Sequence, residues 1–296
     1  MEIKINDEVI DFTLENEKTL GDVTTAIDSW LKKSGFIVTS FKKDKKELPL
    51  TRKEEWFSTP LEYIGELEVL ANLPGEIRLE NLNTACQFFS MLAKGVQASN
   101  HGLIKELMEE YHCIKENLDT MMGSSINKVD TISAALEELT TAFTSEASKR
   151  ILPVINGTIL MLKERMREIV EPVKELKATT DLLKKSADEI SEVAVLLQTG
   201  KDREAMDFII HFTELSQKLI RLYPFLKEAG IMDVRDVTID KLSFKEFYKD
   251  LNRVLKQVID AFQVEDSVLI GDLLEYEVAP RLNTFVNFIN GGSLKK

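Results

Sequence analysis

The chain has 296 residues, a formal net charge of −12 and a pI of about 5.0. This acidic balance argues against a nucleic-acid-binding protein, because phosphate contacts need clustered Lys and Arg, and against binding to an anionic membrane surface. Cys86 and Cys113 are the only cysteines, too few for a disulfide framework. A chain of this length can hold two domains, each with a buried core.

The first fifteen residues alternate charged with apolar side chains and lack the apolar segment of a signal peptide. The chain also contains no run of about 18 apolar residues that could span a membrane. We therefore expect a cytoplasmic protein that does not insert into membranes.

Residues 1–74 combine the alternation of strands with the spacing of a helix. The predicted elements are a strand around Ile3 and Ile5, a turn at Asn6–Glu8, a strand from Ile10 to Leu14, a helix from Leu20 to Leu31 that ends at Gly35, a strand from Phe36 to Phe41, a short strand from Glu47 to Leu50, a short helix with Thr51 and Glu54 as its capping box, and a last strand from Leu67 to Ala71. Their predicted core comprises Ile3, Ile5, Phe12, Val23, Ile27, Trp30, Phe41, Leu67 and Val69.

This order of elements, with the opening MEIKI, the helix LGDVTTAIDSWLKKSG and the closing ELEVLAN, resembles the β-grasp fold of ubiquitin. Ubiquitin binds partners through an apolar patch on its open sheet face, and the matching positions here are Lys4, Lys42 and Leu70, a mostly charged set. Together with Val38, these are the candidate partner-binding residues. Conjugated ubiquitin-like proteins end in a free Gly-Gly, whereas this domain continues into a helix, so the resemblance implies a binding domain rather than a modifier.

From Leu79 onward the pattern is helical, with apolar residues at heptad spacing. Seams are predicted from Leu79 to Val96, Ile104 to Met121, Val129 to Phe143, Ile155 to Leu197, Ala205 to Leu226, Phe247 to Phe262 and Ile270 to Ile289. Ser243 with Glu246 predicts a capping box before the sixth seam. The predicted fold class is therefore α+β: a β-grasp domain at 1–74 followed by an elongated all-α helical bundle at 75–296, with coiled-coil-like packing.

The longest seam, from Ile155 to Leu197, keeps its rhythm through Pro172. Because proline removes one helical hydrogen bond and clashes with the preceding turn, a kink or a short break is expected there. The unbroken rhythm favours a kink. Pro280 is expected to kink the last helix in the same way.

Metal and cofactor motifs are lacking. Glu109 and His112 have the spacing of a di-iron helix, but no second Glu-x-x-His pair exists to complete such a site. His112 is therefore interpreted as a surface residue. Cys86 lies on its seam and is predicted to be buried, whereas Cys113 lies off its seam and is predicted to be exposed. No four zinc ligands and no phosphate-binding loop can be assembled, so we predict no metal, no cofactor and no catalytic residues.

Asp272, Glu275 and Glu277 form an acidic cluster beside Arg281. Paired carboxylates can carry acid–base chemistry, but Glu277 and Arg281 also have the spacing of an ordinary helical ion pair. The solvated ion pair is the preferred interpretation.

The sequence thus favours a non-enzymatic cytoplasmic adaptor or scaffold. Its β-grasp domain would bind one protein partner, and its helical part would bind another or form a homo-oligomer. One alternative is a chaperone-like helical holder of an export substrate. The other is an enzyme that uses the Asp272/Glu275/Glu277 cluster.

Overall fold

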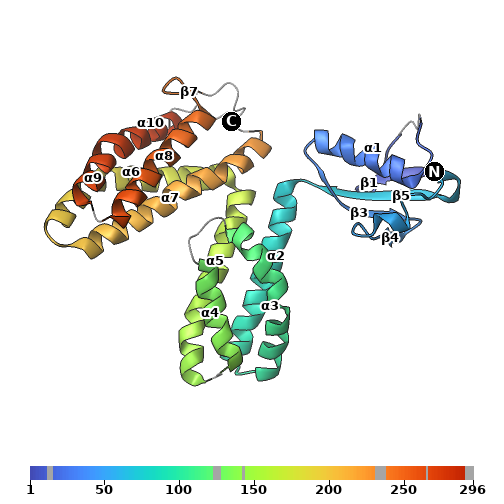
Figure 1. Ribbon diagram of the computed structural model, residues 1–296, viewed down its shortest axis with the longest axis horizontal. Helices are drawn as coiled ribbons and strands as arrows, with labels where there is room; N and C mark the ends of the chain where they lie inside the picture. The colour runs from blue at the N-terminus through green and yellow to red at the C-terminus, as the bar shows by residue number, and fades with distance from the viewer. Residues whose placement is uncertain (12–15, 123–127, 142–143, 231–237, 265, 291–296) are drawn as a thin grey trace. The chain divides into compact units, whose positions relative to one another are not determined.

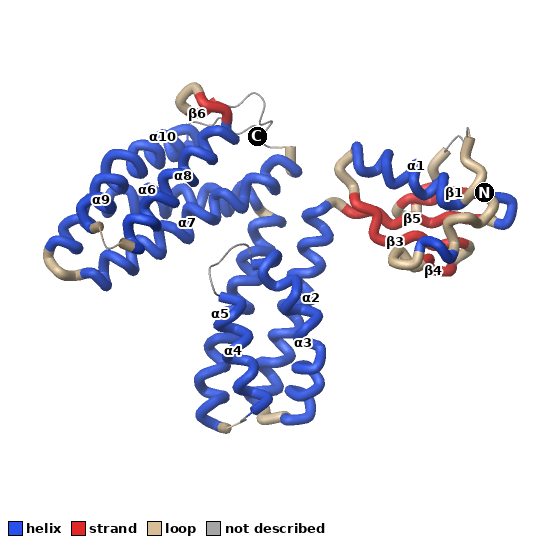
Figure 2. Tube along the Cα trace, viewed as in Figure 1, coloured by secondary structure: helices blue, strands red, loops and turns tan. Residues whose placement is uncertain are grey.

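A computed structural model (Figure 1) describes residues 1–11, 16–122, 128–141, 144–230, 238–264 and 266–290. The chain divides into two compact units, Met1–Thr84 and Ala85–Lys296. The first unit contains a five-stranded sheet, and the described part of the second is helical apart from one small hairpin (Figure 2). The predicted α+β class is confirmed.

The N-terminal unit begins with a mixed sheet and one helix. Its elements are β1 (Glu2–Ile5), β2 (Glu8–Val9), α1 (Leu20–Lys33), β3 (Ile37–Lys43), β4 (Lys46–Leu48), two 3-10 turns (Lys53–Glu55 and Leu61–Tyr63), β5 (Glu66–Asn72) and the first part of α2 (Pro74–Gln97). The strand order is β2-β1-β5-β3-β4, with β1 and β5 parallel and the other neighbours antiparallel. Helix α1 covers one face of this sheet (Figure 1). We call residues 2–72 the head.

Helix α1 begins and ends as the sequence predicts. Thr19 and Asp22 form a reciprocal capping box, in which each side chain accepts a hydrogen bond from the backbone N–H of the other residue. Gly35 follows the helix with φ of +84°, a conformation that glycine adopts without steric cost. The predicted start and stop of α1 are confirmed.

Of two local predictions in the head, one is wrong and the other lies partly outside the described residues. Thr51 and Glu54 form no capping box, because a 3-10 turn begins after Arg52 without any side-chain cap. The second strand is only Glu8–Val9, and residues 12–15 of the predicted strand lie outside the description.

Trp30 is 49% exposed, so its predicted place in the core is wrong. The buried stripe of α1 is centred on Ile27 and Leu31 and extends to Thr24, which leaves Trp30 at the edge of the buried face. Trp56, which follows the first 3-10 turn, fills the core instead and is 5% exposed.

The C-terminal unit contains the rest of α2 and the remaining elements. These are α3 (His101–Met122), α4 (Lys128–Thr141), α5 (Ser145–Val170), α6 (Pro172–Gln198), α7 (Asp202–Glu228), β6 (Thr238–Ile239), β7 (Leu242–Ser243), α8 (Phe244–Gln263), α9 (Ser267–Asp272), a π-helical turn (Leu273–Val278) and α10 (Ala279–Asn290). The capping box predicted before α8 is confirmed. The Glu246 carboxylate accepts a hydrogen bond from the Ser243 backbone N–H at 3.0 Å, and the Glu246 backbone N–H donates one to the Ser243 hydroxyl oxygen at 3.3 Å.

Of the two outcomes expected at Pro172, a kink or a short break, the structure shows the break, and the favoured kink is wrong. Helix α5 ends at Val170, Glu171 takes a non-helical conformation (φ −127°, ψ 53°), and Pro172 opens α6. Proline suits the first position of a helix, because the N–H that it lacks would have no partner there. The chain therefore breaks at Pro172 rather than kinking.

The helices α6 to α10 share one apolar core. Leu183 on α6, Phe212 on α7, Val254 on α8 and Phe285 on α10 all belong to this cluster of buried side chains. The π-helical turn lies just before Pro280, and α10 follows it directly, so the helical turns continue through the proline.

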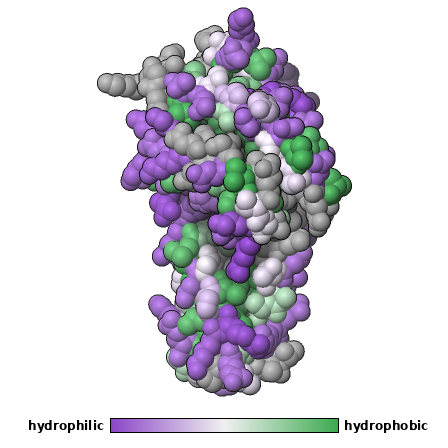
Figure 3. All heavy atoms as spheres, turned by 90° about the vertical axis from the view of Figure 1, so that its left-hand side faces the viewer, coloured by the Kyte–Doolittle hydropathy of each residue, from purple (hydrophilic) through white to green (hydrophobic). Residues whose placement is uncertain are grey.

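The face drawn in Figure 3 is mostly hydrophilic, with hydrophobic residues in separate small groups. Within the described ranges, no helix combines the length and apolar character needed to cross a membrane.

The two cysteines differ in exposure as predicted: Cys86 is buried on α2 and Cys113 is exposed on α3. A thiol reagent under native conditions should therefore label Cys113 quickly and Cys86 only when α2 opens locally. Time-resolved mass spectrometry of the labelled protein would measure both rates. Equal, fast labelling of the two thiols would contradict the burial of the α2 seam.

Candidate functional site

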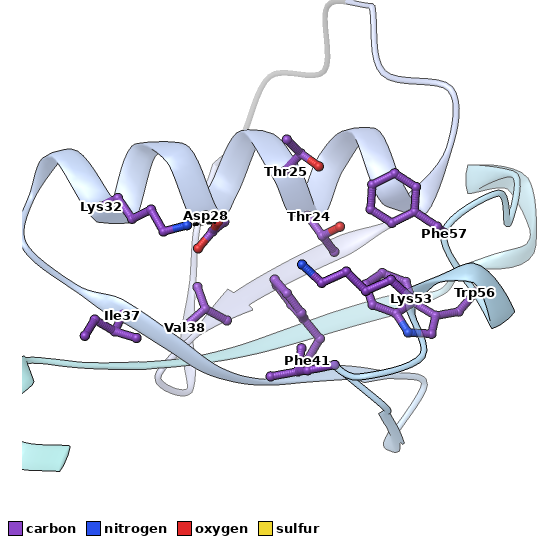
Figure 4. A pocket seen from close by; sticks show the side chains of 11 residues that line it. Thr24, Thr25, Asp28, Lys32, Ile37, Val38, Phe41, Lys53, Trp56 and Phe57 are labelled. Carbon is purple, nitrogen blue, oxygen red and sulfur yellow. Dashed lines mark hydrogen bonds and ion pairs between the residues drawn. The ribbon is translucent and has the colours of Figure 1, made fainter.

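A groove of about 450 Å³ runs between α1 and β3 in the head (Figure 4). Its walls come from three separate segments: α1, β3, and the stretch after β4. The lining residues are Thr24, Thr25, Asp28, Lys32, Ile37, Val38, Phe41, Leu50, Lys53, Trp56 and Phe57. The groove thus combines apolar walls with a few charged and hydroxyl groups, a mixture typical of binding sites.

Aromatic side chains close one end of the groove. The Trp56 ring lies 6.1 Å from that of Phe41 and 5.8 Å from that of Phe57, and its indole N–H donates to the Pro49 carbonyl at 3.0 Å. The Phe57 ring packs where α1 begins, so closely that any side chain at Gly21 would overlap it. These contacts fix the shape of this end.

The backbone of Val38 forms an open edge beside the groove. Val38 is in register with Ala71 on β5. The backbone N–H and C=O of Ala71 both form hydrogen bonds with the side chain of Asn6, which lies on the other side of β5 from β3. In an antiparallel ladder, the N–H and C=O of Val38 must then point away from β5. Strand β4 pairs only with Phe41–Lys43, so no described strand covers Val38.

Charged side chains lie along the groove. The Lys32 amino group is bonded to Asp28 at 2.6 Å, one turn earlier on α1. Figure 4 places the amino group of Lys53 between Thr24 and Phe41, over the interior of the groove. The site therefore offers both backbone hydrogen-bonding groups and cations to a bound molecule.

The structure separates the four candidate residues of the sequence. Lys4 and Lys42 lie on the open sheet face on either side of Glu68, with Leu70, 49% exposed, on the same face. Lys4 is paired with Glu66 and Lys42 with Glu68, so this face is largely neutralised. Val38 lies on the opposite face and lines the groove, because the β3–β5 register shifts between Val38 and Ser40.

Sequence reasoning missed the other residues of the groove. Trp56 and Phe57, adjacent aromatic residues in a segment expected to be a short helix, are the one sequence feature that could have indicated an apolar wall. Lys53 carried no such signal, since lysines are usually solvated.

A second polar cluster joins α5, α6 and α7. Glu168 on α5 is 1% exposed and receives hydrogen bonds from Arg165 at 2.6 Å and from both ends of the Arg221 guanidinium at 3.2 and 3.3 Å. Arg165 also donates to the carbonyl of Met122, at the end of α3. We call Arg165, Glu168 and Arg221 the buried triad, after its buried centre at Glu168; Arg221 itself is partly buried, with 14% of its side chain exposed.

Lys218 on α7 extends this cluster with bonds to Glu164 at 2.8 Å and Glu175 at 2.7 Å. Burial by itself would raise the pKa of Glu164, but the hydrogen bond and charge of Lys218 outweigh it and hold that pKa below its usual value. Burial would lower the pKa of Lys218, yet its two carboxylate partners raise it. Both groups are therefore charged near neutral pH, and the cluster stabilises the helix junction instead of offering a reactive group.

The acidic cluster of the last helix is solvated. Asp272 and Glu275 are exposed, and Glu277 accepts a hydrogen bond from Arg281 at 2.7 Å. Arg281 also bonds Asp250 on α8 at 2.6 Å. His112 is exposed, and the described part of the chain contains no group of three metal-binding side chains. We therefore take the groove of the head as the candidate site.

Comparisons with known proteins match two separate parts of the chain. Residues 1–71 match the family model described as the TP0873 N-terminal domain, and residues 174–288 match a domain of unknown function, DUF8042. An uncharacterized protein of Treponema pallidum (strain Nichols) is 28% identical over 102 residues, which cover 34% of this chain and 50% of the relative. No solved structure matches the chain significantly. In its N-terminal quarter the chain is thus similar to the TP0873 N-terminal domain.

Proposed function

We propose that this protein is a non-enzymatic adaptor whose head binds an extended segment of a partner protein along β3. The strand order of the head and its single covering helix support the β-grasp resemblance, a scaffold that hosts many binding activities. The observation that carries the proposal is the open backbone edge at Val38 beside the groove.

An extended segment fits this site for two physical reasons. Unpaired backbone groups on a sheet edge are satisfied by another strand, which gives affinity through main-chain hydrogen bonds. Side chains of that added strand alternate in direction, so every second one can enter the space between α1 and β3. The open sheet face, with its ion pairs at Lys4 and Lys42, offers neither feature.

The proposal predicts that Val38→Pro weakens partner binding about tenfold or more, because the change removes a donor and places a ring on the edge. The fold should survive, since proline is tolerated on a strand edge whose N–H faces outward. Val38→Ile, which keeps the N–H, is the matched control and should bind normally.

Photocrosslinking in a native cell extract would locate the bound partner. A crosslinker placed at Ile37, which lines the groove, should capture a partner protein. This crosslink should be lost in the Val38→Pro variant and kept in the Val38→Ile variant. The same crosslinker at Leu70, on the open face, should capture much less. Capture at Leu70 alone, insensitive to Val38→Pro, would move the binding site to the open face and refute the proposal.

A further inference from the structure

The groove is locally positive in a strongly acidic chain. Its lining includes the cations Lys32 and Lys53 but the single carboxylate Asp28, whereas the whole chain has a net charge of −12. A binding site whose charge opposes that of its surroundings selects partners by electrostatic complementarity.

The two lysines are not equivalent. Lys32 is already neutralised by Asp28 at 2.6 Å. Lys53 forms no ion pair with any other described residue, and Figure 4 shows its amino group over the interior, between α1 and β3. A carboxylate entering the groove would therefore find its strongest partner at Lys53, through a charge-assisted hydrogen bond.

The apolar walls lie next to this cation. Val38, Phe41 and Leu50 present the side chains that an entering apolar residue would contact. Val38 also supplies the open backbone edge, so backbone and side-chain contacts coincide in one short stretch. A segment that satisfies all three features must be extended, apolar at alternate positions, and acidic beside its apolar run.

We propose that the segment bound by the head is acidic and apolar, with a carboxylate that pairs with Lys53 and alternating apolar side chains that enter the groove. This inference rests on the proposed function, since it names the chemistry of the segment that the groove receives. A second copy of the chain fits less well, because two β3 edges paired about a twofold axis would bring the same lysines toward each other.

Selection from a displayed library of random short peptides on the full-length protein tests the inference. The parent protein should enrich peptides that carry Asp or Glu next to an apolar run. Lys53→Glu should lower the affinity of a selected acidic peptide about tenfold and should itself enrich peptides with Lys or Arg at that position. Lys42→Glu, the same substitution on the open face, is the control and should leave the selection unchanged.

The outcomes separate the two proposals. Enriched peptides that depend on Val38 but show no charge preference, or that bind Lys53→Glu equally well, overturn the acidic inference and leave the groove in place. Peptides that bind Val38→Pro as well as the parent, or the absence of any enriched peptide, overturn the proposal that the groove binds an extended segment.

Discussion

Replacing Glu168 with glutamine should lower the free energy of unfolding by about 3–5 kcal/mol, because the change removes the buried carboxylate that Arg165 and Arg221 share and leaves the buried Arg165 only the more distant Glu164, at 3.7 Å. Arg165 and Arg221 both donate to this carboxylate, which is 1% exposed. Glutamine keeps the shape of the side chain and one acceptor oxygen but replaces the other oxygen with an NH2 donor, so the loss combines the charge with the hydrogen bonds of one carboxylate oxygen. Chemical denaturation followed by circular dichroism measures it.

Glu138→Gln is the matched control for this variant. Glu138 on α4 pairs with Arg150 on α5, so the substitution again removes a carboxylate that bonds an arginine of another helix. Here the side chains are 37% and 69% exposed, and an exposed pair of this kind contributes about 0.2–1 kcal/mol. If the two variants unfold at the same denaturant concentration, Glu168 is not shielded from water in the buried triad, and the predicted large loss is wrong.

The buried triad also shows where sequence reasoning fails. The heptad seam of α5 predicted Met166 and Ile169 as its inward positions, yet both are only half-buried, and Arg165 and Glu168 are buried instead. Charged residues three apart on a helix are usually solvated. Their burial depends on Arg221, more than fifty positions away, and no local pattern encodes that contact.

Local signals, in contrast, predicted the elements well. The spacing of α1, the Gly35 stop, the capping box at Ser243 and the contrast between Cys86 and Cys113 are all properties of neighbouring residues. The sequence favoured a kink over a break at Pro172 because the seam keeps its phase on both sides of the proline. Phase alone does not distinguish a kinked helix from two helices.

The groove could not be predicted from these patterns. Its walls come from segments that the fold brings together, and its open edge depends on the register of β3 against β5. The shift between Val38 and Ser40 turns Val38 toward α1, whereas Lys42 faces the other side. A one-residue shift of this kind exchanges the two faces of a strand, and the alternation in the sequence does not reveal where it occurs.

The core of the α6–α10 group provides the second large effect: Leu183→Ala should lower the free energy of unfolding by about 2–5 kcal/mol. Leu183 is fully buried on α6 within the cluster that also contains Phe212 and Leu219 of α7. Its neighbour Thr180 is buried as well, with its hydroxyl bonded to the Leu176 carbonyl at 2.8 Å, so little side-chain volume is available to fill a cavity. The cost should therefore lie in the upper half of the range.

Lys184→Ala tests the register of α6 at the adjacent position. Lys184 is exposed, and alanine is a good helix former, so this change should alter the free energy of unfolding by less than about 0.5 kcal/mol. Both variants place alanine in the same helix, and their difference therefore reports burial rather than helicity. Equal midpoints for the parent and both variants in urea would mean that α6 does not pack against α7 along Leu183. Because Leu183 is buried within a single chain, its replacement should destabilise the protein at any concentration, and a loss that vanishes on dilution would instead place this seam between chains.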